Sequence, residues 1–430
     1  MHTNAETPEQ LSSPTVGSSV EREGSSSRGR GARILFHPLT LWIAFASVHV
    51  ILGAIAYLTH KGFGDVYNVY RPWAQAALNG QVMGINEPWV YPIAAIVPIV
   101  IPFVFFGESH YGLGWLVLVT IVDACAFAVL VVRRHRPRLI AAWWWIAFLL
   151  LLGPVAVGRL DAISAPLAIV GLLWLSTLPR TAVILLTVAT WIKVWPAALL
   201  AAAVVSLQRR WRIVVVAVAV SAAIVAIPLA FGSGWNVVSF VTKQTGRGIQ
   251  IEAPVAIPWM WQAALKIPGA RVYYDQVLVT FQVAGQGTHI GEALMTPLLG
   301  LAVAVILLIG IRAARQHRAP ESILPELALA LVTAFIAFNK VGSPQYISWF
   351  AAPVVLGLVA QGRRFRVPAV LILVTAGLTQ LIYPYFYGGL MHPNVVMVSV
   401  LTLRNLMYFV IMGWCIQQLW GARKNAVLAH

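Results

Sequence analysis

Apolar runs long enough to cross a lipid bilayer recur along this chain, from Leu39 almost to its C-terminus. A membrane-spanning helix needs about 20 predominantly apolar residues. Hydrophobic residues make up 59% of the 430 residues and charged residues only 10%, whereas soluble domains carry about a quarter charged residues. The pattern therefore predicts an all-α polytopic membrane protein and excludes a string of ordinary soluble domains.

The excess of basic residues indicates membrane topology, and no nucleic-acid partner is expected. The formal net charge is +16, from 30 Lys and Arg against 14 Asp and Glu. The basic residues form short clusters between the apolar runs, as the positive-inside rule expects for cytoplasmic loops, whereas a nucleic-acid-binding protein gathers them on one face. The clusters are Arg28, Arg30 and Arg33; Arg133, Arg134, Arg136 and Arg138; Arg209, Arg210 and Arg212; Arg312, Arg315 and Arg318; Arg363, Arg364 and Arg366; and Arg423 and Lys424.

The chain divides into one membrane domain and two short tails. Residues 1–33 are rich in Ser, Thr, Glu, Gly and Pro and lack the apolar content to bury a core, so a disordered cytoplasmic tail is expected. Residues 34–420 form the predicted transmembrane domain, and residues 421–430 a cytoplasmic C-terminal tail. We interpret the first apolar run as an anchor and not as a cleavable signal peptide, because more than thirty polar residues precede it.

Keeping every basic cluster on the cytoplasmic side requires two unusual segments. The first is 92–106, which is short and is broken by Pro98 and Pro102; we expect a re-entrant or interfacial helix on the outer side there. The other apolar runs predict about ten full transmembrane helices, with both termini in the cytoplasm. These runs are 39–58, 113–132, 140–157, 163–178, 213–231, 291–311, 323–338, 346–359, 369–384 and 395–419.

The second unusual segment lies between Arg180 and Arg209. Only about 28 residues separate these two positions, although two full spans need about 40. A half-depth helical hairpin is predicted there, with Lys193 near its turn. A lysine at membrane depth is costly unless it faces a watery cavity or a partner charge.

The outer loops of this topology carry the side chains best suited to catalysis. Asp65 follows the first apolar run, with Tyr67, Tyr70 and Trp73 close behind it. Such a carboxylate suits the removal of a proton from a sugar hydroxyl, although a helix cap is the alternative. Aromatic rings bind the apolar faces of sugars, but they also concentrate at every bilayer interface. A site on this extracytoplasmic side has no direct access to cytosolic nucleotides, so its donor is expected to be a lipid or another exported molecule.

Several basic residues are placed at the same outer level and could hold a phosphate group. A phosphate leaves more readily when its developing negative charge is neutralised. The competing interpretation is snorkelling or a simple salt bridge, which is strong for Lys243 and weak for Lys193. The candidates are Arg159, Lys193, Lys243, Arg247 and Lys340.

The remaining polar residues give weaker signals. We expect Asp161 to pair with Arg159 at a helix turn, and Asp123 could pair with a basic group of the bundle. Cys125 and Cys415 lie in apolar runs and predict packing, not a disulfide or metal site. The scattered outer carboxylates give no convincing ligand set, so no metal site is assigned, although a divalent metal stays open as a cofactor. No P-loop, GxSxG, HExxH or GxGxxG pattern is present.

Several segments, taken in order, resemble the membrane-embedded GT-C glycosyltransferases, specifically glycosyltransferase family 87 of actinobacteria. That family includes polyprenyl-phosphate-mannose-dependent mannosyltransferases and an arabinofuranosyltransferase of cell-envelope biogenesis. Ile93 stands where the family's Tyr-Pro-Pro segment has its second proline. The matching segments are GFGDVYNVY, VYPIAAIVPIVIP, GRLDAISAPLA, WIKVWPAALL, GRGIQIEAP and NKVGSPQYISWF.

The resemblance implies a GT-C-type bundle that performs an inverting sugar transfer with Asp65 as general base. It implies a polyprenyl-phosphate-linked sugar as donor, a lipid-anchored glycan as acceptor and membrane lipids as surroundings, with no nucleotide or redox cofactor. The donor phosphate would be bound by Lys193, Arg247 and Lys340, with Arg159 as a further candidate. The residues expected to line the substrate pocket are Tyr67, Tyr70, Tyr91, Gln250, Glu252, Gln345 and Tyr346.

Two other classes of protein remain compatible with the sequence. A secondary transporter or lipid flippase would also have many helices, proline-broken segments and a buried lysine, but the chain shows no repeated half. A catalytically silent scaffold for envelope assembly is the third alternative. Within the enzyme class, mannose is the leading sugar and arabinofuranose its rival.

Overall fold

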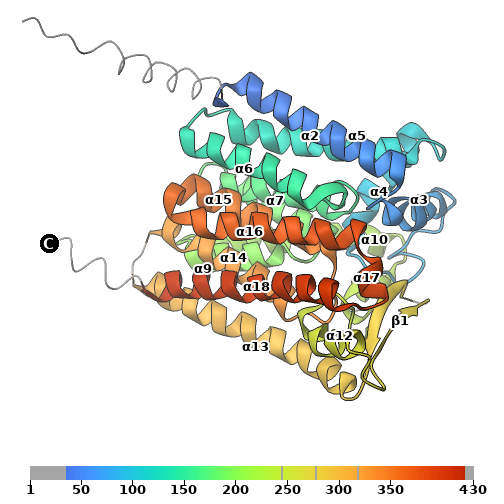
Figure 1. The fold of residues 1–430 in the computed structure, drawn as a ribbon. Helices are drawn as coiled ribbons and strands as arrows, with labels where there is room; N and C mark the ends of the chain where they lie inside the picture. The colour runs from blue at the N-terminus through green and yellow to red at the C-terminus, as the bar shows by residue number, and fades with distance from the viewer. Residues whose placement is uncertain (1–34, 244–245, 277, 317–318, 422–430) are drawn as a thin grey trace, which may run out of the picture.

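The computed structural model describes residues 35–243, 246–276, 278–316 and 319–421, which form a bundle of helices lying roughly along one axis (Figure 1). The expected tail 1–33 and nearly all of the expected tail 421–430 lie outside these residues. Eight described segments are long and apolar enough to cross a membrane, which supports the predicted all-α membrane protein. They are Pro38–Thr59, Tyr111–Val131, Arg136–Ala156, Arg210–Ala230, Thr288–Arg315, Pro320–Ala337, Pro344–Tyr385 and Val395–Gly421.

The spanning segments do not all correspond to single helices. The segment Pro344–Tyr385 contains two helices separated by the 3-10 turn Gly362–Phe365. The helix α7 (Asp161–Trp174) has 14 residues, about 21 Å at the usual rise, so the number of full crossings stays a prediction. The other main helices are α2 (Pro38–Thr59), α5 (Tyr111–Val131), α6 (Arg136–Leu152), α10 (Arg210–Ala230), α13 (Thr288–Arg315), α14 (Leu324–Ala337), α15 (Ala351–Gln361), α16 (Arg366–Gln380) and α18 (Val395–Gly421).

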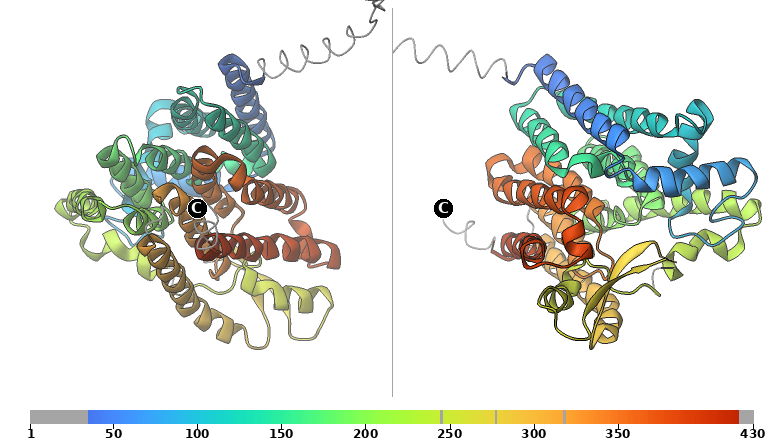
Figure 2. Two further views of the ribbon diagram at one scale, coloured as in Figure 1. Left: turned by 90° about the vertical axis from the view of Figure 1, so that its left-hand side faces the viewer. Right: turned by 45° about the vertical axis from the view of Figure 1, so that its right-hand side comes forward.

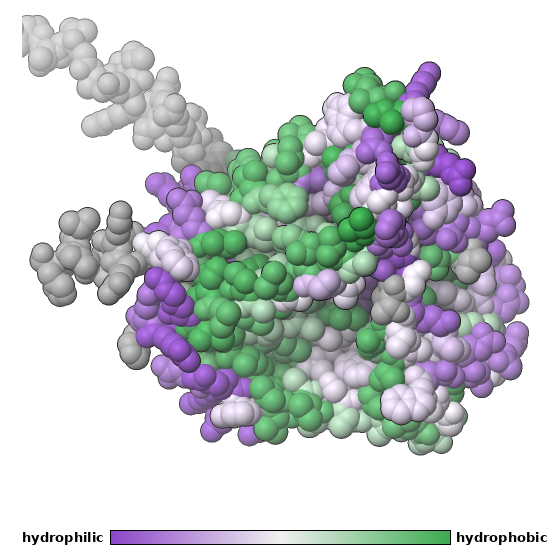
Figure 3. All heavy atoms as spheres, turned by 90° about the horizontal axis from the view of Figure 1, so that it is seen from below, coloured by the Kyte–Doolittle hydropathy of each residue, from purple (hydrophilic) through white to green (hydrophobic). Residues whose placement is uncertain are grey.

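The two ends of the bundle differ in character. Both ends of the described chain lie at one end, together with the α5–α6 and α15–α16 junctions that carry basic clusters (Figure 1). The opposite end carries the short elements of the long loops. Figure 3 shows a broad hydrophobic band on one face of the molecule, between two hydrophilic ends. This distribution is typical of a protein that crosses a membrane.

Both unusual segments fold as short helices. The helix α4 (Ile96–Phe106) has 11 residues, about 16 Å, and is too short to cross a hydrocarbon core of about 30 Å. The helices α8 (Pro179–Ile192) and α9 (Ala197–Ser206) form the predicted hairpin, and Lys193 begins its turn. The short helix and the hairpin are therefore confirmed, while their depth in a membrane stays a prediction.

The far end of the bundle holds the elements that build the site. Asp65 precedes a π-helical turn, Val66–Tyr70. The expectation of an all-α chain misses one antiparallel hairpin, in which β1 pairs with β2. Phe281 and Val283 alternate with polar residues in β2, whereas β1 carries three consecutive apolar or aromatic residues, Val272, Tyr273 and Tyr274. The other elements here are α3 (Arg71–Leu78), α11 (Ser239–Thr242), α12 (Ile257–Ala264), β1 (Arg271–Asp275), β2 (Thr280–Ala284) and α17 (Gly388–Met391).

Burial separates the central helices from the peripheral ones. Within its spanning window, 78% of the α14 segment is buried inside the protein, against 11% for α10 and 11% for α13. The helices α7, α14 and α15 therefore form the protein core, because their side chains are buried almost all round. The helices α10 and α13 leave most of their apolar side chains for lipid.

Candidate functional site

Asp65 forms an ion pair with Arg159, whose Nη1 lies 3.0 Å from the Asp65 carboxylate oxygen Oδ1. Arg159 belongs to the turn between α6 and α7, far from Asp65 in sequence. A close approach at Gly158 brings the two loops together, because a side chain at this position would collide with the carbonyl oxygen of Gly62. The sequence thus predicted both residues as functional, but not their pairing.

Arg159 is buried and hydrogen-bonds to two further side chains. Its Nε donates to Gln345 Oε1 at 3.2 Å, and its Nη2 donates to the Tyr383 hydroxyl at 3.2 Å. Burial alone would lower the pKa of Arg159, but the Asp65 carboxylate and the neighbouring tyrosines raise it above its ordinary value. The guanidinium is therefore permanently charged and held in one orientation.

Lys193 and Asp161 form a second buried ion pair next to the first. Lys193 Nζ lies 3.4 Å from Asp161 Oδ2, and Trp349 Nε1 donates to Asp161 Oδ1 at 2.5 Å. The expected pairing of Asp161 with Arg159 is wrong, because side chains two residues apart at a helix start point to different sides. The ammonium of Lys193 also lies 4.5 Å from the ring centre of Tyr91. The cost of placing a lysine here is thus offset by a carboxylate and a ring face.

Tyr70 shows that the two ion pairs form one cluster. Burial raises its pKa well above the ordinary value, and the charges of Tyr91, Asp65 and Asp161 act in the same direction while Arg159 opposes them. Its hydroxyl accepts a hydrogen bond from the backbone N–H of Leu160 at 3.3 Å. Tyr70 is therefore a buried neutral phenol within electrostatic range of both carboxylates.

The two carboxylates differ in access to substrate. The side chain of Asp65 is 31% exposed, whereas that of Asp161 is 1% exposed. A substrate hydroxyl can approach Asp65 directly, but the bulk of Trp349 and the Lys193 ammonium cover Asp161. Asp65 is thus the carboxylate of this cluster that can exchange a proton with a bound substrate.

Some of the other predicted residues lie in this cluster, and the rest lie in the loops around it. Tyr346 stacks on Trp349 with ring centres 4.2 Å apart and lies within electrostatic range of Lys193 and Arg247. Arg247 is half-buried, and among the described residues its Nε has no hydrogen-bond partner. Arg247 therefore has donor capacity that a bound anion could use.

Lys340 and Gln250 join two loops to each other through their backbone. The backbone N–H of Gln250 donates to the carbonyl of Lys340 at 3.0 Å, which joins two outer loops. Both side chains are largely buried. Tyr67 points elsewhere: it packs against Gly112 at the start of α5, with its ring 5.0 Å from that of His60. Tyr67 therefore packs beside the start of α5 and has no contact with the ion pairs of the cluster among the described residues.

Glu252 is buried and paired with a residue that the sequence analysis missed. Its Oε2 lies 2.8 Å from Nη1 of Arg404, and its backbone carbonyl accepts from Nη2 of the same arginine at 2.7 Å. Burial raises the pKa of Glu252, and Arg404 opposes that shift. Arg404 lies inside an apolar run. This position is a signal by which the sequence could have revealed Arg404, because ionisable residues within membrane spans usually have a structural or functional role. Tyr383, the hydroxyl partner of Arg159, gave no comparable signal.

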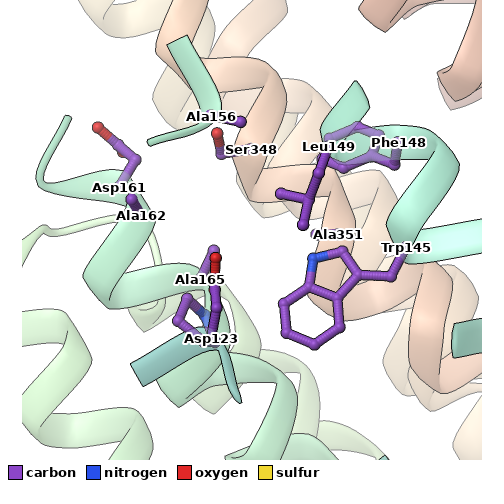
Figure 4. Close-up of a pocket in the computed structure, with 11 residues that line it drawn as sticks. Asp123, Trp145, Phe148, Leu149, Ala156, Asp161, Ala162, Ala165, Ser348 and Ala351 are labelled. Atoms are coloured by element: carbon purple, nitrogen blue, oxygen red, sulfur yellow. The ribbon is translucent and has the colours of Figure 1, made fainter. Parts of the chain in front are cut away.

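Another polar pair lies within the bundle, and its Asp123 lines the same small cavity as Asp161 of the cluster. His49 Nε2 on α2 lies 2.9 Å from Asp123 Oδ2 on α5, so the basic partner suggested for Asp123 is confirmed. A cavity of about 10 Å³ lies beside Asp123, between α5, α6, α7 and α15 (Figure 4). This volume suits one water molecule and not a sugar ring.

The described part of the chain brings no three His, Cys, Asp or Glu side chains together in an arrangement that could hold a metal ion. The fold defines a polytopic helical membrane protein with a polar site at one end of its bundle. No family model, curated protein or solved structure matches the chain.

Proposed function

We propose that this protein is an inverting glycosyltransferase that uses a polyprenyl-phosphate-linked sugar as donor. The observation that carries the proposal is the partly exposed Asp65 beside buried cations at one end of a membrane bundle. A carboxylate within reach of solvent can take the proton of an acceptor hydroxyl, while nearby cations stabilise a departing phosphate. The acceptor is a lipid-anchored cell-envelope glycan, and the leading sugar is mannose.

The reaction is a single in-line displacement. The acceptor oxygen gives its proton to Asp65 and forms a bond to the anomeric carbon of the donor sugar. The bond from that carbon to the phosphate oxygen breaks, and the polyprenyl phosphate leaves with the electron pair. Displacement from the opposite face converts a β-linked donor into an α-linked product.

The two cations closest to Asp65 already have carboxylate partners. Arg159 is paired with Asp65 itself and Lys193 with Asp161. A donor phosphate brings further negative charge, and the Nε of Arg247, which has no partner in the described part of the chain, supplies hydrogen-bonding capacity for it. In the proposed mechanism, Arg247 therefore makes the direct phosphate contact, and Arg159, Lys193 and Lys340 add positive potential.

Sugar transfer by the purified, reconstituted protein tests this function. Radiolabelled polyprenyl-phosphate-mannose and polyprenyl-phosphate-arabinose are each supplied with a membrane-lipid acceptor pool. We expect product from one donor, and a loss of about 10²–10⁴-fold in Asp65→Asn, because that variant lacks the general base. The matched control is Glu87→Gln, which neutralises an exposed carboxylate of the same outer loop and should leave transfer unchanged. Near-normal transfer by Asp65→Asn would remove Asp65 from the role of base.

A transporter or lipid flippase is the second candidate function. The His49–Asp123 pair favours it, because ionisable pairs between spanning helices are common in transport pathways. Product from neither sugar donor, together with counterflow of a labelled solute or lipid in vesicles, would establish this alternative. Loss of that counterflow in His49→Ala, with normal folding, would place the pair in its pathway.

A further inference from the structure

A series of aromatic rings connects the outer β-hairpin to Arg159. The ring centres of Tyr274 and Phe281 are 4.9 Å apart, those of Phe281 and Tyr387 6.2 Å, and those of Tyr387 and Tyr383 5.2 Å. Tyr383 accepts the hydrogen bond from Arg159, which in turn pairs with Asp65. We call these four rings, Tyr274, Phe281, Tyr387 and Tyr383, the aromatic track.

The strand register places the outer half of the track on one face of the hairpin. Tyr274 on β1 lies opposite Phe281 on β2, so both rings project from the same face. Figure 1 and Figure 2 show this hairpin beside α17, which Tyr387 directly precedes. The neighbouring Tyr273 projects from the other face, where its hydroxyl donates to Gln282 Oε1 at 3.0 Å.

The rings of the track are held in place yet remain accessible. Tyr274 is 47% exposed, and the other three rings are half-buried. The hydroxyl of Tyr387 is hydrogen-bonded to Glu252, whose carboxylate is held by Arg404. On the opposite side of the site, by contrast, Trp89 is only 2% exposed and packs against Trp73 and Tyr91. The track thus leads from an exposed tyrosine on the hairpin to Tyr383, which contacts Arg159.

We propose that the aromatic track binds the glycan of the acceptor beyond the sugar that carries the attacking hydroxyl. The apolar C–H faces of sugar rings pack on aromatic rings, and each step along the track is comparable to the size of one sugar. The inference rests on the proposed function and adds a substrate class to it. The enzyme extends a chain of several sugars, and a bare lipid headgroup is a poor acceptor.

Equilibrium binding of oligosaccharides tests the track without requiring catalysis. α-Linked manno-oligosaccharides of increasing length, and a matching arabinofuranose series, are titrated into the full-length protein in detergent. For one series we expect the dissociation constant to fall with each added sugar. Tyr274→Ala should weaken binding of the longest member about threefold to tenfold and leave the monosaccharide unaffected. Tyr273→Ala, which removes the adjacent ring on the other face, should bind like the wild type.

Three outcomes would overturn the proposal. These are affinity that does not depend on length in either series, a Tyr274→Ala variant that binds long glycans normally, and equal losses in the two tyrosine variants. Failure of the proposed function looks different. Length-dependent binding that Tyr274→Ala weakens, together with no sugar transfer from either donor, would keep the glycan site and reject the reaction.

Discussion

At the scale of single residues, the site is organised by three ion pairs whose charges, apart from Asp65, are buried. Asp65 faces Arg159, Asp161 faces Lys193, and Glu252 faces Arg404. Removing two charges from water costs several kcal/mol each, so such pairs persist only with close contacts and additional hydrogen bonds. The Glu252–Arg404 pair is the most buried of the three, with side-chain exposures of 2% and 1%.

Loss of Arg404 should destabilise the protein strongly, because Glu252 would remain buried without its cation. We expect Arg404→Met to lower the free energy of unfolding by about 3–5 kcal/mol. The double variant Glu252→Gln with Arg404→Met should be less destabilised than Arg404→Met alone, since no uncompensated charge remains. Denaturant titration in mixed micelles measures both.

Arg364→Met is the matched control for this pair, because Arg364 is exposed at the opposite end of the bundle. Its unfolding free energy should change by less than about 1 kcal/mol. Equal effects of the two arginine substitutions would mean that the Glu252–Arg404 contact contributes no special stability.

The sequence predicted individual polar residues better than their partners. Asp65 stood out as an isolated charge just after the first apolar run, and Lys193 as an isolated charge inside an apolar stretch. The partners could not be found in the same way, because a contact across the bundle depends on the rotation of two helices about their axes. Tyr383, which joins the site from the far end of the chain, is an example.

At the scale of structural elements, a glycine allows two loops of the site end to pack closely against each other. A Cβ on Gly342 would collide with the backbone of Glu252 and Ala253. The same two loops share the backbone hydrogen bond between Gln250 and Lys340. Backbone atoms cannot move aside as a flexible side chain can.

Gly342→Ala should therefore force these loops apart. We expect a loss of about 1–3 kcal/mol in unfolding free energy, together with reduced sugar transfer, because Glu252 would be displaced from its support of Tyr387. Thermal unfolding in detergent and the transfer assay measure the two effects. Gly388→Ala, at a position with open space around the added methyl group, should behave like the wild type; equal loss in both variants would contradict the close-packing argument.

Element lengths were largely predictable, because apolar run length and basic clusters constrain them directly. The short α4 and the α8–α9 hairpin follow from residue counts that are too small for full spans. The β-hairpin was not predicted, because its ten strand residues lie in a long polar loop where no buried face produces a clear alternating signal.

At the scale of the whole molecule, the bundle has a basic end and a site end. The chain ends and the α15–α16 junction lie at the first, and the outer loops lie at the second (Figure 1). From the positive-inside rule, we expect the basic end to lie in the cytoplasm. The proposed donor and acceptor are then reached from the extracytoplasmic side of the plasma membrane.

Cysteine labelling in intact cells tests this orientation. In a background with Cys125 and Cys415 replaced by alanine, Glu87→Cys should react with a membrane-impermeant maleimide added outside. Arg364→Cys should react only after the membrane is permeabilised. Both positions are exposed, so differences in burial would not explain the contrast, and the opposite labelling pattern would invert the proposed topology.

The short α8–α9 hairpin also has a consequence for synthesis at the ribosome. Neither helix is long enough to be stable alone in lipid, and α9 packs against α14, which lies more than one hundred residues further along the chain. At ordinary translation rates that helix emerges on the order of ten seconds later. During this interval the nascent hairpin lacks its final neighbour, so we expect correct assembly to require an insertase or chaperone that shelters it until α14 arrives.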